Sequence, residues 1–351
     1  MIVETGLGDL PVAADYPGIT FRGFRGIDAD LPGMAEANRA ARLADGEIEP
    51  LDFGAMRNLY SHFERCDPAT DILIAEADGE IVAYARVEWN DTNDGERIYA
   101  VIALVHPRVR DRGVPRALHT WSERRRRAIA AAHTAAGEAL DRPRWLMTFI
   151  PDTDRASGAL VRAAGYEPFR RFHQMVRPDL EVIPDVPLPD GLEVRPIVAE
   201  SAILRRIFLA QAEAFRDGFG WVDETDEAFA QFREDPTKDP ALWVVAFEGE
   251  EVAGAVMPVL LTGRDGAVEG WLDPVFTRRP WRRRGLARAL IARSLVTVRD
   301  RGAARSCLGV DAQNPNQALD LYESCGFLVA SSETGYRRSL GDRALGRGGV
   351  A

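Results

Sequence analysis

The amino-acid sequence predicts an α/β fold with two tandem domains of similar design. A chain of 351 residues is long for one hydrophobic core, and the same order of strand and helix patterns occurs twice. Equivalent landmarks are a domain length apart, with 173 positions from Ile19 to Leu192 and 161 from Tyr166 to Phe327. The sequence therefore predicts domains over residues 1–177 and 192–340, a proline-rich linker over 178–191 and a disordered tail over 341–351.

Each copy is predicted to begin with a strand and an amphipathic helix and to continue with a β-hairpin. Strands are predicted over 19–22 and 192–197, and an apolar pattern of helical period follows each of them. In each hairpin two apolar runs flank a short turn that contains a glycine, Gly79 or Gly249. The apolar helical positions are Met34, Ala37 and Ala41 in the first copy and Leu204, Ile207, Phe208 and Ala212 in the second.

Each copy then shows a strand, an R-x-x-G turn and a helix, followed by a strand and a short helix. The turns are at 110–113 and 282–285, and the short helices end at Gly165 and Gly326. In the second copy Asn314 is predicted to cap the short helix. The face of the longer helix is predicted to carry Ile291, Leu295 and Val298.

The run Trp281-Arg282-Arg283-Arg284-Gly285-Leu286-Ala287 predicts an anion-binding site. A strand that ends in a glycine turn and opens a helix leaves several backbone N–H groups without helical partners. Glycine permits the tight turn, and the arginines add positive charge and donors suited to phosphate. Just before this run, Pro274 interrupts a predicted strand over 268–277. Because proline cannot donate to a strand ladder, we expect a bulge or splay there that opens a slot for a ligand.

Three segments of the second copy resemble the GNAT superfamily of acyl-CoA-dependent N-acyltransferases. They are V-F-T-x5-R-R-G-L-A-R, L-G-V-D-A-Q-N-P and A-L-D-L-Y-E-S-C-G-F, within residues 269–327. The resemblance implies two GNAT-like domains, each a mixed β-sheet splayed in the middle and flanked by helices. It also implies acetyl-CoA as the donor and direct transfer without a covalent enzyme intermediate. The tandem order, with a weaker N-terminal copy, resembles the two-domain type that includes mycothiol synthase.

The resemblance also implies roles for individual residues. Tyr322 matches the tyrosine that protonates the departing CoA thiolate, and pKa values of about 8.5 for a thiol and about 10 for a phenol allow that transfer. The backbone N–H of Val275 matches the group that stabilises the tetrahedral oxyanion. The implied coenzyme-binding residues are Val275, Phe276, Thr277, Arg282, Arg283, Arg284, Gly285, Leu286, Ala287, Arg288, Asn314 and Tyr322.

The sequence leaves three candidates for the general base, namely two carboxylates and an ordered water molecule. The second copy contains no histidine, so a carboxylate or a water chain must accept the proton of the amine. By the alternation of a strand, Glu269, Trp271 and Asp273 share the face of Val275. Family members place a carboxylate where Trp271 stands, and some place a glutamate where Gly309 stands. Glu269 is favoured over Asp273, and either would need a raised pKa.

The first copy departs from the catalytic pattern. Pro115 stands where the second copy has Ala287, and proline removes one N–H from the turn. Val161 stands where the second copy has Tyr322, so the proton donor is absent at that position. The sequence therefore predicts a degenerate N-terminal domain that supports an active C-terminal domain and closes its substrate cleft.

Composition excludes several other classes of function. A net charge of -10 disfavours nucleic-acid binding, because neutralising phosphates needs surplus positive charge. No apolar run reaches membrane-spanning length and no secretory leader is visible, so we expect a cytoplasmic protein without a membrane partner. The three cysteines, Cys66, Cys307 and Cys325, lack the spacing of a metal site, and no metal is expected.

The sequence thus predicts an N-acetyltransferase that moves an acetyl group from acetyl-CoA to a primary amine of a small molecule. The alternative is a non-catalytic acyl-CoA sensor or interaction module, in which the bound coenzyme changes the packing of the domains. Acidic residues expected near the cleft would suit a cationic amine. These residues are Glu213, Asp217, Asp223 and Glu224.

Overall fold

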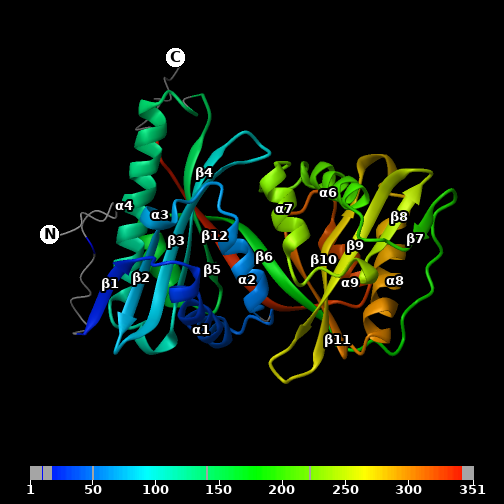
Figure 1. The fold of residues 1–351 in the computed structure, drawn as a ribbon, viewed down its shortest axis with the longest axis horizontal. Coiled ribbons are helices and arrows are strands. Elements are labelled where there is room, and N and C mark those ends of the chain that lie inside the picture. The colour runs from blue at the N-terminus through cyan, green and yellow to red at the C-terminus, as the bar shows by residue number, and fades with distance from the viewer. Residues whose placement is uncertain (1–9, 11–17, 50, 140, 221–222, 342–351) are drawn as a thin grey trace, which may run out of the picture.

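The computed structural model describes residues 10, 18–49, 51–139, 141–220 and 223–341. The predicted disordered tail lies outside this description from residue 342 onward. Within the described residues, strands and helices alternate along the chain and the strands form one continuous 12-stranded mixed sheet. Figure 1 shows two α/β lobes side by side, with helices on both faces of the sheet in each lobe. The predicted α/β fold with two similar halves is confirmed.

The N-terminal lobe contains five strands of the first copy, with five α-helices and one short 3₁₀ helix around them. In order they are β1 (Ile19–Gly23), α1 (Ile27–Asp45), α2 (Phe53–Ser61), α3 (Pro68–Asp71), β2 (Ile72–Ala77), β3 (Glu80–Asp91), β4 (Arg97–Val105), η1 (Pro107–Val109), α4 (Val114–Ala135), β5 (Arg144–Pro151) and α5 (Arg155–Ala163). Two hydrophobic cores cover the two faces of its sheet. One lies under α4 and contains Leu118 and Trp121, and the other lies under α1 and α2 and contains Leu31 and Met34.

The C-terminal lobe repeats this plan. Its elements are β7 (Glu193–Arg195), α6 (Ser201–Phe215), α7 (Asp226–Glu234), η2 (Pro240–Leu242), β8 (Val244–Glu248), β9 (Glu251–Thr262), β10 (Val268–Thr277), η3 (Arg279–Trp281), α8 (Leu286–Asp300), β11 (Arg305–Asp311) and α9 (Ala318–Ser324). The predicted face of α8, with Ile291, Leu295 and Val298, packs in one core, while α6 and α7 cover a second. No helix in the described part of the chain is long and apolar enough to cross a membrane.

The last strand of each copy joins the two lobes. β6 (Glu167–Arg177) pairs antiparallel with β11, β12 (Leu328–Ser339) pairs antiparallel with β5, and the two also pair with each other. The strand order is therefore β1-β2-β3-β4-β5-β12-β6-β11-β10-β9-β8-β7. Figure 1 shows β12 reaching the N-terminal lobe and β6 reaching the C-terminal lobe. Main-chain hydrogen bonds thus fix the lobes to one another, while the predicted linker 178–191 contains no helix or strand.

The sheet splays at one equivalent place in each lobe. β10 pairs in parallel with β11 only over residues 269–271, although both strands continue beyond the pairing. β4 and β5 likewise pair only as far as Val101 and Thr148. Each pair of diverging strand ends leaves a gap in the ladder next to the start of a long helix. The splayed geometry expected for each copy is therefore present.

A register shift accompanies the splay in the C-terminal lobe. The pairing of β10 with β9 shifts between Leu272 and Val275, across the predicted bulge at Pro274. Leu272 and Val275 both contact the core beneath α8 although they are three residues apart. The expectation that Asp273 shares the face of Val275 by simple alternation is therefore wrong, because the bulge changes which face each side chain meets.

The predicted helix cap at Asn314 is also wrong. α9 begins only at Ala318, and turns occupy the residues between β11 and this helix. The Oδ1 atom of Asn314 accepts a hydrogen bond from the backbone N–H of Asn316 at 2.8 Å. This local bond closes a turn instead of starting a helix, and Asn314 stays at the mouth of the splay.

Candidate functional site

A cavity of about 660 Å³ lies in the C-terminal lobe where β10 and β11 separate. We call it the C-terminal cavity. Four segments that are distant in the sequence form its walls: the end of α6, the second half of β10, the start of α8, and the chain from β11 to α9. All predicted coenzyme-binding residues except Arg284 line it. They are Val275, Phe276, Thr277, Arg282, Arg283, Gly285, Leu286, Ala287, Arg288, Asn314 and Tyr322.

The start of α8 forms one end of this cavity. Gly285 has a φ of 86°, and a side chain there would meet open space, so glycine is needed for the left-handed conformation and not for room. Because α8 begins at Leu286, the backbone N–H groups of Leu286, Ala287 and Arg288 have no partner within the helix. These donors and the positive end of the helix make this part of the cavity suited to an anion such as a pyrophosphate.

The first arginine of the R-x-x-G turn is turned into the protein. Arg282 donates to the carbonyl oxygen of Thr277 at 2.9 Å and to that of Ala214 at 3.0 Å, and it pairs with Asp217. In the N-terminal lobe, Arg110 makes the corresponding bonds to the carbonyls of Val105 and Ala41 and to the carboxylate of Asp45. The guanidinium of Arg282 is therefore a structural tie between strand and helix. Arg283 and Arg288 remain as exposed charges beside the cavity.

The strand side of the cavity carries a buried polar atom without a partner. The Oγ1 atom of Thr277 is buried and forms no hydrogen bond in the structure, and Thr277 lines the C-terminal cavity. Leaving a buried hydroxyl unpaired costs about 1–3 kcal/mol. A ligand with amide or hydroxyl groups that ran along β10 would supply the missing partner.

Tyr322 reaches the opposite side of the cavity from α9. Its side chain is 7% exposed, and its ring packs against Phe327 with centroids 6.2 Å apart. Burial raises the pKa of Tyr322, and the neighbouring negative charge of Asp273 raises it further. The hydroxyl is therefore protonated at neutral pH, which is the state that a proton donor requires.

The two carboxylates of β10 have different surroundings. Glu269 is 2% exposed, accepts hydrogen bonds from Nε of Arg305 at 2.8 Å and from Nε1 of Trp271 at 3.0 Å, and borders none of the described cavities. Asp273 is exposed and borders three cavities, while desolvation by the protein around it raises its pKa, an effect that Lys238 opposes. Of the two predicted bases, Asp273 has access to a ligand, whereas Glu269 is held in an ion pair.

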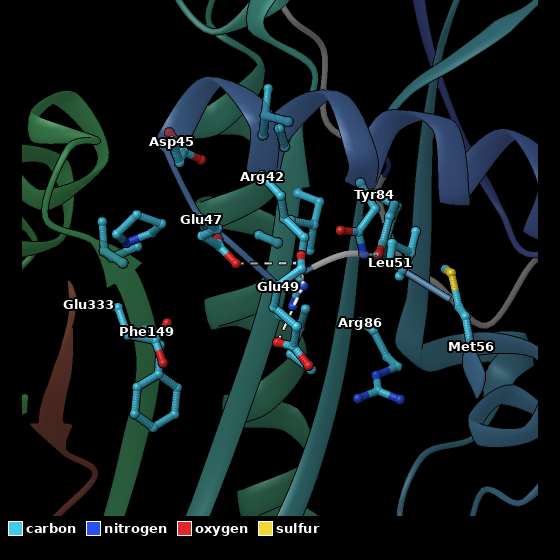
Figure 2. A pocket seen from close by; sticks show the side chains of 18 of the residues that line it. Arg42, Asp45, Glu47, Glu49, Leu51, Met56, Tyr84, Arg86, Phe149 and Glu333 are labelled. Atoms are coloured by element: carbon cyan, nitrogen blue, oxygen red, sulfur yellow. Dashed lines mark hydrogen bonds and ion pairs between the residues drawn. The ribbon is translucent and has the colours of Figure 1, made fainter. Parts of the chain in front are cut away.

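A smaller cavity of about 360 Å³ meets the C-terminal cavity at Asp273 and at residues 309–311. We call it the junction cavity because both copies line it. Three glutamates line it, Glu47 and Glu49 from the segment after α1 and Glu333 from β12, together with Asp45, Asp273 and Asp311. Arg42 pairs with both Glu47 and Glu49 at 3.4 Å, as Figure 2 shows. Within the described residues, no three histidine, cysteine or carboxylate side chains are arranged to hold a metal ion.

The charge of the junction cavity depends on pH. Burial raises the pKa of Glu47 and of Glu49, although Arg42 opposes the shift in both. Burial raises the pKa of Glu333 to about 7, and the negative charge of Glu47 contributes. Placing a cation among these groups would favour their charged forms. The cavity therefore suits a positively charged ligand group.

The sequence pattern did not identify these acidic residues. The four acidic residues expected near the cleft are held in ion pairs with arginines, namely Glu213 with Arg278, Asp217 with Arg279 and Arg282, Asp223 with Arg65, and Glu224 with Arg216. Glu333 reaches the junction only because β12 crosses to the N-terminal lobe. The position of Glu333 in the junction cavity therefore depends on the pairing of β12 with β5, which no local pattern in the sequence predicts.

A third cavity of about 570 Å³ occupies the splay of the N-terminal lobe and continues to Asp273. We call it the N-terminal cavity. Pro115 and Val161 line it at the positions that correspond to Ala287 and Tyr322. Pro115 lies in the first turn of α4 and supplies no N–H there. This lobe thus keeps a cavity but lacks, at these two positions, the N–H and the hydroxyl that its counterpart has.

Comparison with known proteins agrees with this arrangement. The sequence profile of the acetyltransferase (GNAT) family matches residues 204–327. A mycothiol acetyltransferase from Geodermatophilus obscurus is 31% identical over 327 residues, which cover 86% of this chain and 92% of the relative. Another from Salinispora arenicola is 29% identical over 331 residues, covering 88% and 94% of the two chains.

Solved structures show the same fold. A GCN5-related N-acetyltransferase from Sphaerobacter thermophilus aligns over 94% of this chain and 97% of its own, with a TM-score of 0.68 and 24% identity. A tandem GNAT protein from the clavulanic acid biosynthesis pathway aligns over 93% and 100%, with a TM-score of 0.64 and 17% identity. Together with the full-length relatives, these matches show that the chain belongs to the GNAT family as an acyl-CoA-dependent N-acetyltransferase of the tandem two-domain type.

Proposed function

We propose that the C-terminal lobe transfers an acetyl group from acetyl-CoA to a primary amine of a small molecule. The C-terminal cavity carries this proposal, because a helix N-terminus, the unpaired hydroxyl of Thr277, Tyr322 and Asp273 surround one continuous space. The pyrophosphate would accept hydrogen bonds from the N–H groups at residues 286–288. The pantetheine arm would lie along residues 275–277, where it would satisfy Thr277. GNAT acetyltransferases use acetyl-CoA, and this supports acetyl-CoA as the acetyl donor for this chain.

In the proposed reaction the amine nitrogen attacks the thioester carbonyl carbon, and a C–N bond forms as the C–S bond breaks. We assign to the N–H of Val275 the stabilisation of the charge that develops on the carbonyl oxygen. Tyr322 donates its proton to the departing sulfur. Because burial raises the pKa of Tyr322, its phenolate readily recovers a proton after each turnover.

We assign the general base to Asp273 ahead of Glu269. The nucleophile is a neutral amine, so a base must take one proton from the nitrogen before or during attack. The raised pKa of Asp273 makes it a stronger base than an ordinary aspartate, and the carboxylate borders both the C-terminal and the junction cavities. Glu269 would first have to leave Arg305 and Trp271. Ordered water remains the third possibility, and removal of the Asp273 carboxylate distinguishes it.

The acceptor would enter through the junction cavity, since this space meets the C-terminal cavity at Asp273. Glu47, Glu49 and Glu333 would attract an ammonium group and keep it next to the base. This chain resembles mycothiol acetyltransferases. The acceptor of those enzymes is therefore the first amine to test in a panel.

The test is to incubate the full-length protein with acetyl-CoA and the amine panel and to measure release of free thiol. We expect turnover with at least one cationic amine, and Tyr322→Phe should lower kcat about 100-fold or more. Tyr336→Phe is the matched control, because Tyr336 is as buried as Tyr322 but bonds to Arg162 in the N-terminal lobe. Tight binding of acetyl-CoA with no turnover of any amine would instead favour the sensor.

A further inference from the structure

The N-terminal cavity contains a buried arginine with unused donors. Arg86 of β3 is 4% exposed and lines this cavity, yet its Nε and Nη1 atoms form no hydrogen bond. Its remaining nitrogen, Nη2, pairs with Glu88 at 3.0 Å. Three N–H donors of a buried cation are therefore left without an acceptor. Leaving such donors unpaired is costly, so the site is matched to an oxygen-bearing ligand group.

The surroundings of Arg86 hold its guanidinium in place. The group lies over the rings of Tyr60 and Phe63, with 5.4 Å from its carbon to each ring centroid. Nearby, Asn38 donates to the hydroxyl of Tyr84 at 2.9 Å, while its own Oδ1 is buried and unpaired. Asn38 and Tyr84 line the same cavity. This end of the cavity is thus a rigid pocket with unsatisfied polar atoms and aromatic walls.

The same cavity leads to the proposed site of transfer. Asp273, Glu47, Glu49 and Glu333 line it together with Arg86. In the view of Figure 2, Glu49 lies between Glu333 and Arg86, and Glu49 and Arg86 project to the same side of α1. One cavity thus borders the proposed base, three glutamates and the buried Arg86, and the cations Arg42, Arg110 and Lys238 line it as well. A volume of about 570 Å³ is within the usual range of about 300–1,000 Å³ for small-molecule sites.

We propose that the acceptor is an amino acid in the broad sense, an amine that also carries a carboxylate, and that Arg86 binds this carboxylate at the far end of the N-terminal cavity. This inference rests on the proposed function and specifies its substrate class. The ammonium end lies among the acidic groups beside Asp273, and the carboxylate accepts hydrogen bonds from Nε and Nη1 of Arg86. Charge then alternates along the ligand as it does along the cavity, which favours one orientation of binding.

The experiment compares three series of primary amines of increasing chain length with the full-length protein and saturating acetyl-CoA. The series are ω-amino carboxylic acids, their ω-amino amides and plain alkylamines. At the chain length that spans the cavity, we expect kcat/KM for the acid to exceed that for the amide by about 10- to 100-fold, with the alkylamine poorer still. Equal rates for all three series at every length would overturn the inference.

Substitution of Arg86 gives a second measurement. Arg86→Gln should raise KM for the acid about 10- to 100-fold and abolish the preference over the amide, while Arg86→Lys should keep part of it. Arg108→Gln is the control, because Arg108 is an exposed arginine of the same lobe that pairs with Glu80. An equal loss for acid and amide in Arg86→Gln would show a purely structural role and refute the proposal.

Binding without turnover separates this inference from the proposed function. The thermal midpoint of the wild-type protein is measured with each acid and each amide in the absence of acetyl-CoA. Stabilisation by the acid alone, lost in Arg86→Gln, would support the carboxylate site even if no amine were acetylated. Thiol release with amines but no preference for acids would uphold the proposed function and reject the Arg86 site.

Discussion

Replacing Asp273 by asparagine tests the assignment of the base most directly. The change keeps the size of the side chain and removes its ability to accept a proton. Asp273 is exposed, borders three cavities and forms no ion pair with the residues that the structure describes, so replacing it breaks no strong contact. We therefore expect little change in the thermal midpoint and a fall in kcat/KM of about 100- to 10,000-fold, the range for loss of a general base.

The pH dependence of kcat/KM gives a second test of Asp273 as the base. The base acts in its deprotonated form, so kcat/KM of the wild-type protein should rise with pH through the pKa of Asp273 and then level off. Desolvation by the surrounding protein raises this pKa, so the rise should occur above the range of an ordinary aspartate. Asp273→Asn should lose this limb of the profile, which is measured by thiol release at saturating acetyl-CoA.

Glu269→Gln is the matched comparison on the same strand. Glu269 is buried in an ion pair with Arg305, so neutralising it should lower the free energy of unfolding by about 3 kcal/mol while keeping the shape of the pH profile. The opposite pattern, with an unchanged profile in Asp273→Asn and a lost limb in Glu269→Gln, would refute our ordering. If both variants kept the full profile, ordered water would be the base.

Two further predictions concern the frame of the site. Arg282→Met should lower the free energy of unfolding by about 2–4 kcal/mol and change KM for acetyl-CoA less than tenfold. Arg110→Met in the other lobe should behave in the same way. A large rise in KM at unchanged stability would mean that Arg282 contacts the coenzyme. Gly270→Ala would place a Cβ 2.6 Å from Val298 and should lower the free energy of unfolding, measured by chemical denaturation, by about 1–3 kcal/mol. Gly309→Ala on the neighbouring strand meets no atom within 4 Å and should leave the stability nearly unchanged. Equal stability of the two variants would contradict this prediction.

Local chemistry made the residues around the C-terminal cavity predictable. Gly285 must be glycine for its positive φ, Pro274 must disturb a strand ladder, and a helical period must place Tyr322 inward. Each of these constraints acts within a few residues, so the sequence contains them. The cap at Asn314 was mistaken because the same side chain can close a turn or start a helix, and only its surroundings decide which.

The acceptor side could not be predicted in the same way. Glu47 and Glu49 follow a helix of the first copy, and their place beside Asp273 depends on how the lobes meet. The backbone N–H of Ile48 donates to the side chain of Gln174 on β6 at 2.8 Å, which ties this acidic segment to the joined strands. Such contacts join residues more than a hundred positions apart, and neither periodicity nor motif spacing records them.

The exchange of β6 and β12 makes the C-terminal lobe depend on the first copy for strand pairing. Removing the N-terminal lobe would take β6 from the edge of β11 and leave β12 without β5, so the C-terminal lobe would lose strand partners on that side. It would also remove Glu47 and Glu49, which face Asp273 across the junction. The first copy has Val161 in place of Tyr322, the proton donor that we propose, but it supplies a strand to the other lobe and one wall of the junction cavity, where we propose that the acceptor binds.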